Sequence, residues 1–220
     1  MIRLPNDFSG SNLTYKIESK DDIDFSQIYE DRQTLPSEIL SQICNVRSFF
    51  LTFSDMTSSI NERKKINYQE IIFKIPLVFE NKKFIFPVVS YVSDPYSFLR
   101  GSYLGFYKKM NFLYTRSVST QKFSDPNLIS ISIPNIHEIF ESSSVINKEL
   151  SAPFLLHRCS TIFAPSDCLC DLNIRNYECS YSESFKVPNT KIGTILNTDL
   201  FSNEYYLTRD KFTLEGITVH

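Results

Sequence analysis

The chain has 220 residues, with 23 Lys and Arg against 25 Asp and Glu and a formal net charge of -2. Acidic and basic residues are interspersed, which argues against a nucleic-acid partner or an anionic-membrane partner. Nineteen Phe and twelve Tyr with only five Gly predict a β-rich fold packed with aromatic side chains.

No apolar run reaches the ~18 residues of a membrane span, and residues 1–20 lack the apolar segment of a signal peptide. We therefore expect a cytoplasmic protein. The chain is long enough to bury a sizeable core, and no change of composition marks a boundary. A single domain over residues 1–220 is the resulting expectation.

The N-terminal part alternates polar segments with short regular elements. Residues 1–14 are polar and are expected to form an extended lead-in to a short strand at 15–17. A helix is predicted over 37–43 and a strand over 46–53. Residues 54–67 are predicted to form a polar loop. Its charged run at 62–65 is either a solvated surface or part of a cover over a neighbouring site.

Alternation of apolar residues predicts a β-hairpin after this loop. The polar residues 80–83 supply its turn, and the return strand covers 84–91. The apolar face of the first strand consists of Ile71, Phe73, Ile75, Leu77 and Phe79.

A short helix is predicted next. Asp94 is suited to cap its N-terminus, Pro95 fits the first helical position, and Gly105 is well placed to end it. Two lysines, Lys108 and Lys109, follow almost at once.

The remainder is predicted to be mostly strands. Segment 169–187 is either one long bent strand or a hairpin that turns at 173–176. Further strands are expected at 113–120, 128–133, 154–163, 191–201, 205–207 and 211–219, with a short helical turn at 135–140.

The cysteines form an odd set without the spacing of a disulfide framework. They are Cys44, Cys159, Cys168, Cys170 and Cys179. A strand would place the thiols of Cys168 and Cys170 on one face, but His137 and His157 are isolated, so we predict reduced thiols and no metal site.

The adjacent lysines Lys108 and Lys109 are the strongest chemical signal in the chain. Two ammonium groups disfavour each other's charge, and apolar surroundings disfavour both, so one of them can become a neutral amine. A neutral lysine attacks carbonyls and forms a Schiff base that accepts electrons. The plain alternative is a solvated pair at a helix end, where the helix dipole favours cations.

Other catalytic motifs are absent from the sequence: it contains no glycine-rich phosphate loop, no nucleophile elbow and no zinc-binding helix motif. No cofactor is therefore predicted. Tyrosines at 91, 96, 103 and 107 surround the lysines, either as core residues with hydroxyls at the rim or as groups that orient a substrate.

The segment 68–109 resembles the acetoacetate decarboxylase family. The similarity rests on Tyr68-Gln69-Glu70, the hairpin, the helix entry Val92-Ser93-Asp94 and the run Gly105-Phe106-Tyr107-Lys108-Lys109. The resemblance implies an α+β fold with a mostly antiparallel, barrel-like sheet and a few short helices. It also implies a closed cavity and a homo-oligomer.

By the same resemblance, Lys108 stands at the Schiff-base position, Lys109 at the perturbing position and Glu70 at a catalytic carboxylate. Candidate substrate-binding residues are Tyr68, Tyr91, Arg100, Phe106 and Tyr107.

Several family features are missing. Tyr107 replaces the proline before the lysines, and Arg100-Gly101-Ser102 stands where Gly-Arg-Glu is usual. A second glutamate would fall at 49–51, where no residue is acidic and Asp55 is the nearest carboxylate. The family's N-terminal arginine has only loose candidates, which are Arg3, Arg32 and Arg47.

The leading hypothesis is a lyase that forms a lysine iminium with a keto acid or a polyketide-like carbonyl compound. Decarboxylation, aldol or dehydration chemistry and cyclisation are all open. The alternative is a non-catalytic protein of the same fold that binds a small molecule. A pocket walled by Phe49, Phe106 and Tyr107 would suit a ligand larger than acetoacetate.

Overall fold

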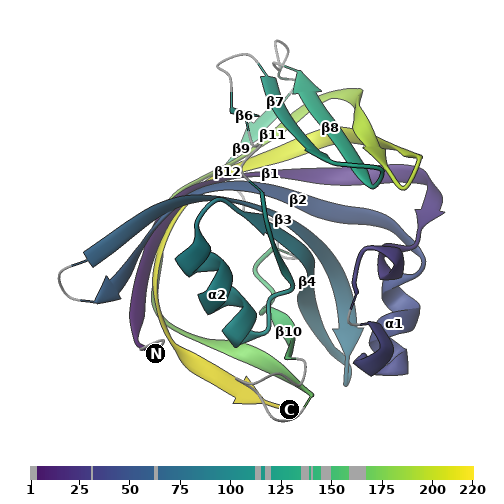
Figure 1. Cartoon of the computed structure of the whole chain (residues 1–220). Coiled ribbons are helices and arrows are strands. Elements are labelled where there is room, and N and C mark those ends of the chain that lie inside the picture. Colours follow the sequence, from purple (N-terminus) through teal and green to yellow (C-terminus); the bar gives the residue numbers. More distant parts are fainter. Residues whose placement is uncertain are drawn as a thin grey trace.

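The computed structural model describes most of the chain (Figure 1). The described residues are 4–30, 32–61, 64–111, 115–116, 120–134, 139, 141–144, 150–158 and 167–220. The strands are β1 Asn6–Ile23, β2 Val46–Asn61, β3 Lys64–Phe79, β4 Lys82–Val92, β5 Lys108–Met110, β6 Thr115–Arg116, β7 Thr120–Asp125, β8 Ile129–Pro134, β9 Glu141–Ser143, β10 Leu155–Arg158, β11 Cys168–Ile195 and β12 Thr198–Val219. The helices are α1 Ser37–Ile43 and α2 Pro95–Leu104, with short 3-10 turns at Phe25–Gln27 and Arg32–Thr34.

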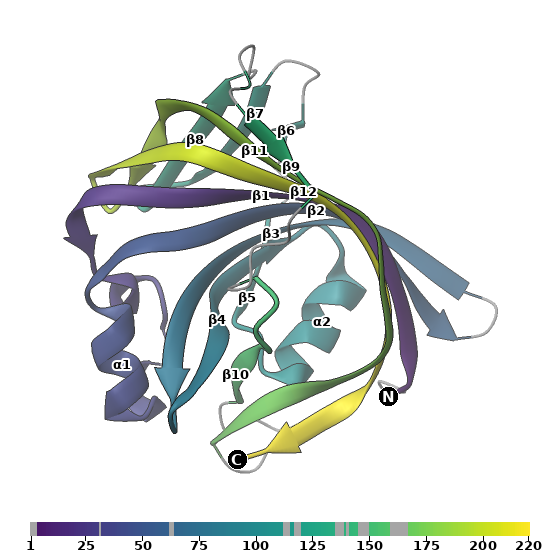
Figure 2. The same ribbon diagram turned by 180° about the vertical axis from the view of Figure 1, so that it is seen from behind.

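The strands form one curled sheet in the order β5-β4-β3-β2-β1-β12-β11-β8-β7-β6, with β9 and β10 paired to β11. The β4–β5 pair is parallel and the other strand pairs are antiparallel. Helix α2 lies inside the curl, whereas α1 lies near the β3–β4 turn (Figures 1 and 2). The predicted mostly antiparallel, barrel-like α+β fold is confirmed.

The predicted hairpin is formed by β3 and β4, but its turn is tighter than expected. Glu80 and Asn81 adopt positive φ angles of 48° and 62° and close the hairpin as a two-residue turn. Lys82 already pairs with Phe79. The charge of Lys82 and Lys83 suggested a turn, but both residues belong to the start of β4 and their side chains are exposed to solvent.

Helix α2 begins and ends where the sequence predicted. The Asp94 side chain accepts a hydrogen bond from the Ser97 amide at 2.8 Å, and Pro95 occupies the first turn. Gly105 adopts a left-handed conformation with φ of 105°, and its amide donates to the Gly101 carbonyl at 3.1 Å.

Two polar segments predicted as irregular are strands. β1 starts at Asn6 and pairs with both β2 and β12, so the lead-in expected at 1–14 is wrong from Asn6 onward. The loop expected at 54–67 is also wrong, because β2 continues to Asn61 and β3 begins at Lys64. Their polar side chains hydrogen-bond to one another across neighbouring strands. Residues 62 and 63 lie outside the described part.

The C-terminal region is built from two long strands. β11 runs without a hairpin through 173–176, so the bent-strand alternative is correct. Its turn to β12 is Leu196-Asn197, with positive φ angles of 48° and 64°, a turn that the predicted strand 191–201 missed. The strand predicted at 154–163 is β10 over Leu155–Arg158, and its remaining residues lie outside the described part. The predictions at 113–120 and 135–140 also fall largely outside it.

The two faces of the sheet pack differently. The main core joins the outer face of β1–β4 to α1 and to β7 and β8, and it is rich in Phe, Ile and Leu. A second cluster packs α2 into the curl, centred on Phe8, Leu104 and Leu214. A third, smaller cluster contains Phe50 and Ile85. No described helix has the length and apolar character that crossing a bilayer requires.

Candidate active site

Strand alternation brings three of the polar residues to the face that looks into the curl. Ile72 pairs with Ser90 across β3 and β4, and Ser90 pairs with Lys108 across β4 and β5. Glu70 is two residues from Ile72, so Glu70, Ser90 and Lys108 share this inner face.

Glu70 and Lys108 form a buried ion pair. The Lys108 Nζ lies 2.6 Å from Glu70 Oε1, and the two side chains are 5% and 9% exposed. Ser90 is fully buried and donates a hydrogen bond to the same carboxylate oxygen. Glu70 thus holds the amine and is itself held by a hydroxyl, an arrangement that fixes the lysine in one orientation.

Helix α2 confines the Lys108 side chain from the other side. Gly101 faces it so closely that a Cβ at this position would lie 1.9 Å from Lys108 Cε. The Phe106 ring centroid is 5.3 Å from the Lys108 nitrogen. A larger residue at 101 would displace the lysine chain from its observed path, so glycine here leaves room for Lys108.

Lys109 points to the opposite face and joins a separate cluster. Its Nζ lies 3.4 Å from Glu30 Oε1 and 4.0 Å from Asp125 Oδ2. The Tyr91 hydroxyl donates to Asp125 at 2.6 Å, and the Tyr107 ring centroid is 5.7 Å from Lys109 Nζ. A hydrogen bond from Tyr107, followed by the charge of Lys109, lowers the pKa of Glu30.

This arrangement corrects the grouping predicted from the sequence. The predicted set placed Lys109, Tyr91 and Tyr107 around one site with Lys108. The structure instead puts these three residues across the sheet from it. Burial, then the hydrogen bond to Asp125, raises the pKa of Tyr91 well above its usual range. Tyr91 and Tyr107 also pack in the main core.

Arg100 and Tyr68 lie on the side of α2 that faces the ends of β1–β3. Arg100 is 2% exposed, and its Nη1 donates to Ser58 Oγ at 2.6 Å. Its guanidinium stacks 4.5 Å from the Phe8 ring centroid. Burial, then the Glu70 carboxylate, raises the pKa of Tyr68 well above its usual value, while the Arg100 charge acts in the opposite direction.

A row of polar side chains continues the site across the inner face. We call Ser54, Asn12, Thr208 and Asp210 the polar belt. It starts beside Glu70, because Ser54 of β2 is paired with Glu70 of β3. Ser54 Oγ donates to Asn12 Oδ1 at 2.6 Å, and Asn12 Nδ2 donates to Asp210 Oδ2 at 2.5 Å. Thr208 Oγ1 also donates to this carboxylate at 2.9 Å.

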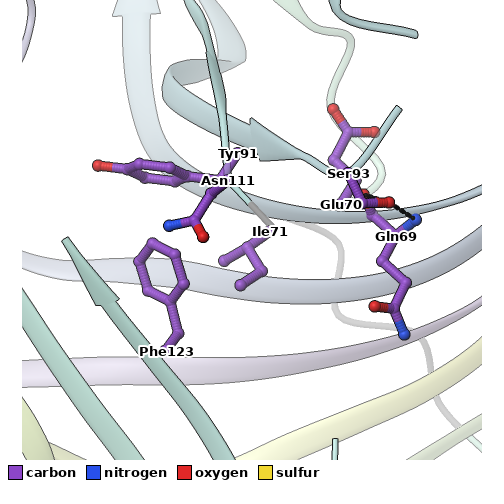
Figure 3. A pocket seen from close by; sticks show the side chains of 7 residues that line it. All are labelled: Gln69, Glu70, Ile71, Tyr91, Ser93, Asn111 and Phe123. Carbon is purple, nitrogen blue, oxygen red and sulfur yellow. Dashed lines mark hydrogen bonds between the residues drawn. The ribbon is translucent and has the colours of Figure 1, made fainter. Parts of the chain in front are cut away.

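A small pocket lies near the far end of the same hairpin (Figure 3). Its lining residues are Gln69, Glu70, Ile71, Tyr91, Ser93, Asn111 and Phe123. Figure 3 shows Tyr91, Phe123 and Ile71 gathered on one side, with the Glu70 carboxylate directed away from them. Glu70 lines this pocket, whereas Lys108 and Lys109 do not.

The described part of the chain contains no group of three or more His, Cys, Asp and Glu side chains that could hold a metal ion. Cys44, Cys168, Cys170 and Cys179 are free thiols. His157 is buried and hydrogen-bonded to the Tyr29 hydroxyl at 2.8 Å. Cys159 and His137 lie outside the described residues.

Comparisons of the sequence with protein-family models and with curated proteins give no match. Solved structures, however, match over nearly the whole chain. The enduracididine biosynthesis enzyme MppR in complex with pyruvate has a TM-score of 0.68 at 11% identity, covering 100% of this chain and 91% of that chain. An acetoacetate decarboxylase-like enzyme from Sphingomonas wittichii RW1 has a TM-score of 0.65 at 12% identity, covering 98% and 92%. Acetoacetate decarboxylase from Legionella pneumophila has a TM-score of 0.63 at 12% identity, covering 99% and 87%.

The chain has the acetoacetate decarboxylase-like fold. TM-scores of 0.63–0.68 establish the shared path of the backbone, whereas identities of 11–12% leave the chemistry to be argued from the residues of this chain.

On this fold, no acidic residue of β2 stands across from Glu70. Phe49 and Leu51 lie in the main core on the outer face, so the expected pocket wall at Phe49 is wrong. Strand alternation places the Phe49 side chain on the outer face, where its ring packs on the Phe25 ring at a centroid distance of 5.1 Å. Asp55 pairs with Gln69 and accepts its side-chain hydrogen bond at 3.1 Å, which directs it away from Glu70.

Two arginines of this chain whose side chains the structure describes, Arg47 and Arg100, are not brought to Lys108. Arg47 is 65% exposed and pairs with Asp22 at 2.7 Å on the surface. Arg32 lies in a 3-10 turn. Arg3 lies outside the described residues. Arg100 is buried, but its guanidinium donates a hydrogen bond to Ser58 and stacks on the Phe8 ring.

Sequence reasoning missed Ser90, Gly101 and the polar belt. Ser90 could have been found, because it is the one serine in the otherwise apolar and aromatic run 84–92. The belt residues gave no such signal, since Asn, Ser and Thr in a polar stretch are typical of loops.

Proposed function

We propose that this protein is a Schiff-base-forming lyase in which Lys108 is the nucleophile toward a carbonyl substrate. One observation carries the proposal: within the acetoacetate decarboxylase-like fold, a buried lysine amine faces the inside of the curl, 2.6 Å from a carboxylate. Glu70 can take the ammonium proton and leave a neutral amine, which is the form that attacks a ketone.

The reaction then follows from the amine and the acid. Lys108 Nζ bonds to the ketone carbon, and the carbonyl oxygen leaves as water after receiving two protons, which gives an iminium. A bond from the adjacent carbon then breaks, and the iminium accepts its electron pair to give an enamine. The group that leaves is CO2, a proton or an aldol fragment. The enamine carbon is then protonated, with Glu70 placed to supply that proton. Water hydrolyses the new iminium and frees Lys108.

The surroundings of Lys108 support this assignment. Gly101 leaves room for the lysine chain, Ser90 orients Glu70, and Phe106 lies beside the amine. These groups hold the amine in one position and shield it from bulk water. The amine therefore does not have to shed a hydration shell before it attacks a carbonyl.

The substrate class is inferred from what faces Lys108 and from the compared structures. MppR has been solved with pyruvate and with the condensation product of pyruvate and imidazole 4-carboxaldehyde. The acid and arginine candidates whose side chains the structure describes, Asp55, Arg47 and Arg100, are bound to groups other than Lys108. We therefore propose a keto acid or polyketide-like carbonyl compound larger than acetoacetate.

A second candidate function is non-catalytic binding of such a carbonyl compound. The observation that favours it is the residue opposite Glu70, which is Ser54 and not a second acid. A single carboxylate must then serve every proton transfer, and a protein that merely binds its ligand needs none of them.

Borohydride trapping tests the proposal. Purified protein is mixed with a panel of α-keto and β-keto acids and methyl ketones, reduced, and analysed by intact mass and peptide mapping. We expect a substrate-sized adduct on Lys108 that disappears in Lys108→Ala and persists in Lys82→Ala, an exposed lysine of the same hairpin. Undiminished trapping in Lys108→Ala would overturn the assignment. Trapping without release of product would favour the binding protein.

A further inference from the structure

Lys74 is a third lysine on the inner face and has no assigned role. It lies four residues after Glu70 on β3, opposite Phe50 of β2 and Pro87 of β4. Its Nζ stacks 5.6 Å from the Phe154 ring centroid. Lys74 therefore shares the curl with the Lys108–Glu70 pair.

The Lys74 ammonium differs from the two lysines of β5 because no carboxylate of the described residues forms an ion pair with it. Lys108 and Lys109 each lie within 4.0 Å of a carboxylate, whereas none of the described carboxylates is that close to Lys74. Protein surrounds its side chain, which is only partly accessible. Burial lowers the pKa of Lys74 from 10.5 to about 8, with Glu70 and then Asp210 acting weakly in the other direction. An unpaired ammonium in this environment is costly unless a ligand supplies the anion.

Lys74 and Lys108 lie on the same inner face at a separation that one ligand can span, with the rings of Phe154 and Phe106 beside them. Lys74 is displaced from Lys108 by two residues along the strand direction and by the two strand spacings from β3 to β5. Together these place the two α-carbons about 12 Å apart. Between them lie Ile72 and the hydroxyl of Ser90. Phe50 and the Phe154 ring provide an apolar wall beside Lys74.

Three other cations, Arg100, Lys109 and Lys16, are engaged by other groups. Arg100 donates to Ser58 and Ser59, and Lys109 lies on the outer face. Lys16, opposite Phe50 on β1, is already 3.8 Å from Glu18.

We propose that Lys74 binds the carboxylate of the keto acid whose ketone reacts with Lys108. The inference rests on the proposed function for the identity of the reacting carbonyl. The recognition itself needs only an anionic ligand in the curl. Lys74 is then a binding residue that selects acids over neutral ketones, and Lys108 remains the nucleophile.

Calorimetry separates this inference from the Schiff-base chemistry. Hexanoate has the carboxylate but no ketone, and hexanamide is its neutral isostere. We expect hexanoate to bind wild-type protein and to lose about 30-fold in affinity in Lys74→Met, with hexanamide unchanged. Lys82→Met is the matched control, with the same substitution at an exposed position of the hairpin. Equal losses for both ligands, no loss for hexanoate, or no binding of hexanoate to wild type would overturn the inference.

Proton uptake gives a second readout of the same contact. A bound carboxylate favours the charged form of Lys74, so binding of hexanoate at pH 8.5 should take up protons. The titratable groups that face Lys74 are Glu70, Asp210 and, in the adjacent row, Lys16. Titrations in buffers of different ionisation enthalpy should show the uptake in wild type and not in Lys74→Met. Equal uptake in both proteins would assign the proton elsewhere.

Trapping with 5-oxohexanoate and 2-hexanone connects the two lysines. We expect wild type to trap the acid at lower concentration than the ketone, and Lys74→Met to trap both equally, always on Lys108. An adduct on Lys74 itself would overturn the inference. If wild type traps neither compound, the proposed function fails, while the hexanoate titration still decides whether Lys74 binds the carboxylate.

Discussion

Lys108 and Lys109 are consecutive residues of β5, yet their ammonium groups lie on opposite faces of the sheet. Lys108 pairs with Glu70 in the curl, whereas Lys109 lies between Glu30 and Asp125 on the outer face. Strand geometry explains the separation, because successive side chains point in opposite directions. The charge of Lys109 is also offset by its two carboxylates, which weakens its effect on Lys108.

Substitution of Lys109 by Ala should therefore leave the pH midpoint of Lys108 adduct formation within about 0.5 unit of wild type. The measurement is borohydride trapping across a pH series with a trapped carbonyl compound. Tyr107→Phe, on the same outer face, serves as a comparison that keeps the charge of Lys109. A rise of more than one unit in Lys109→Ala would show that its charge acts through the sheet.

Gly101→Ala should impair Lys108 although alanine is the better helix former. The new Cβ would lie 1.9 Å from Lys108 Cε, so either the lysine chain or α2 must move. Overpacking of this kind costs about 1–3 kcal/mol, against a gain of about 1 kcal/mol for replacing a helical glycine. We expect trapping on Lys108 to fall about tenfold or more because the amine leaves its position next to Glu70.

Chemical denaturation and trapping should be measured on the same samples of Gly101→Ala. Ser102→Ala is the matched control, since residue 102 belongs to the same helix and is exposed. Normal trapping in Gly101→Ala would show that the lysine chain does not need its observed path along α2.

Glu70→Gln should remove the base while keeping the shape of the side chain. An amide cannot take the proton of Lys108, and general-base catalysis is worth about 100- to 10,000-fold. The substitution also leaves the buried Lys108 ammonium without its anion, a loss that costs about 3–5 kcal/mol. We expect a large drop in trapping rate and a lower free energy of unfolding. Ser90→Ala should show the same direction with a smaller effect, because the carboxylate remains. Equal rates in Glu70→Gln and wild type would exclude Glu70 as the base.

Local chemistry made part of this structure predictable. The β3–β4 hairpin follows from apolar alternation, and α2 follows from Asp94, Pro95 and Gly105 as cap residues. The prediction that Glu70 lies near Lys108 depended on a motif resemblance, since residues 38 positions apart give no local signal of contact.

Non-local pairing explains what sequence reasoning could not find. Asn12 and Ser54 resemble loop residues, but in the fold they hydrogen-bond to each other at 2.6 Å between paired strands. Thr14 and Thr52 do the same at 2.9 Å and are buried. Lys74 interrupts an apolar strand and could have been noticed, yet its lack of a counter-ion among the described residues is visible only once the neighbouring strands are in place.

Lys74→Met should stabilise the protein at neutral pH by an amount that shrinks as the pH rises. The pKa of Lys74 is about 8 in the folded chain and 10.5 in the unfolded reference, so the unfolded state binds more protons between these values. The wild-type free energy of unfolding therefore rises relative to the variant through this window. The lysine's cost is fully present below pH 8 and is gone above 10.5. The change is at most about 3 kcal/mol.

Urea denaturation of wild type, Lys74→Met and Lys82→Met at pH 7, 8.5 and 10 measures this difference. Tyrosines and other lysines titrate in all three proteins, so the comparison isolates position 74. A pH-independent gap between wild type and Lys74→Met would show that the Lys74 nitrogen stays hydrated in the folded state.

The final prediction concerns acetoacetate. Decarboxylation of a short keto acid benefits from a cation held close to the reacting carbonyl and from acids that protonate the carbanion equivalent. Here the residue opposite Glu70 is Ser54, and Arg47 pairs with Asp22 on the surface. We therefore expect weak or absent release of acetone from acetoacetate, together with Lys108 adducts of larger carbonyl compounds. The assay follows acetone and CO2 with wild type and Lys108→Ala side by side. Rapid CO2 loss that requires Lys108 would contradict the prediction and show that the single acid Glu70 suffices for the complete reaction.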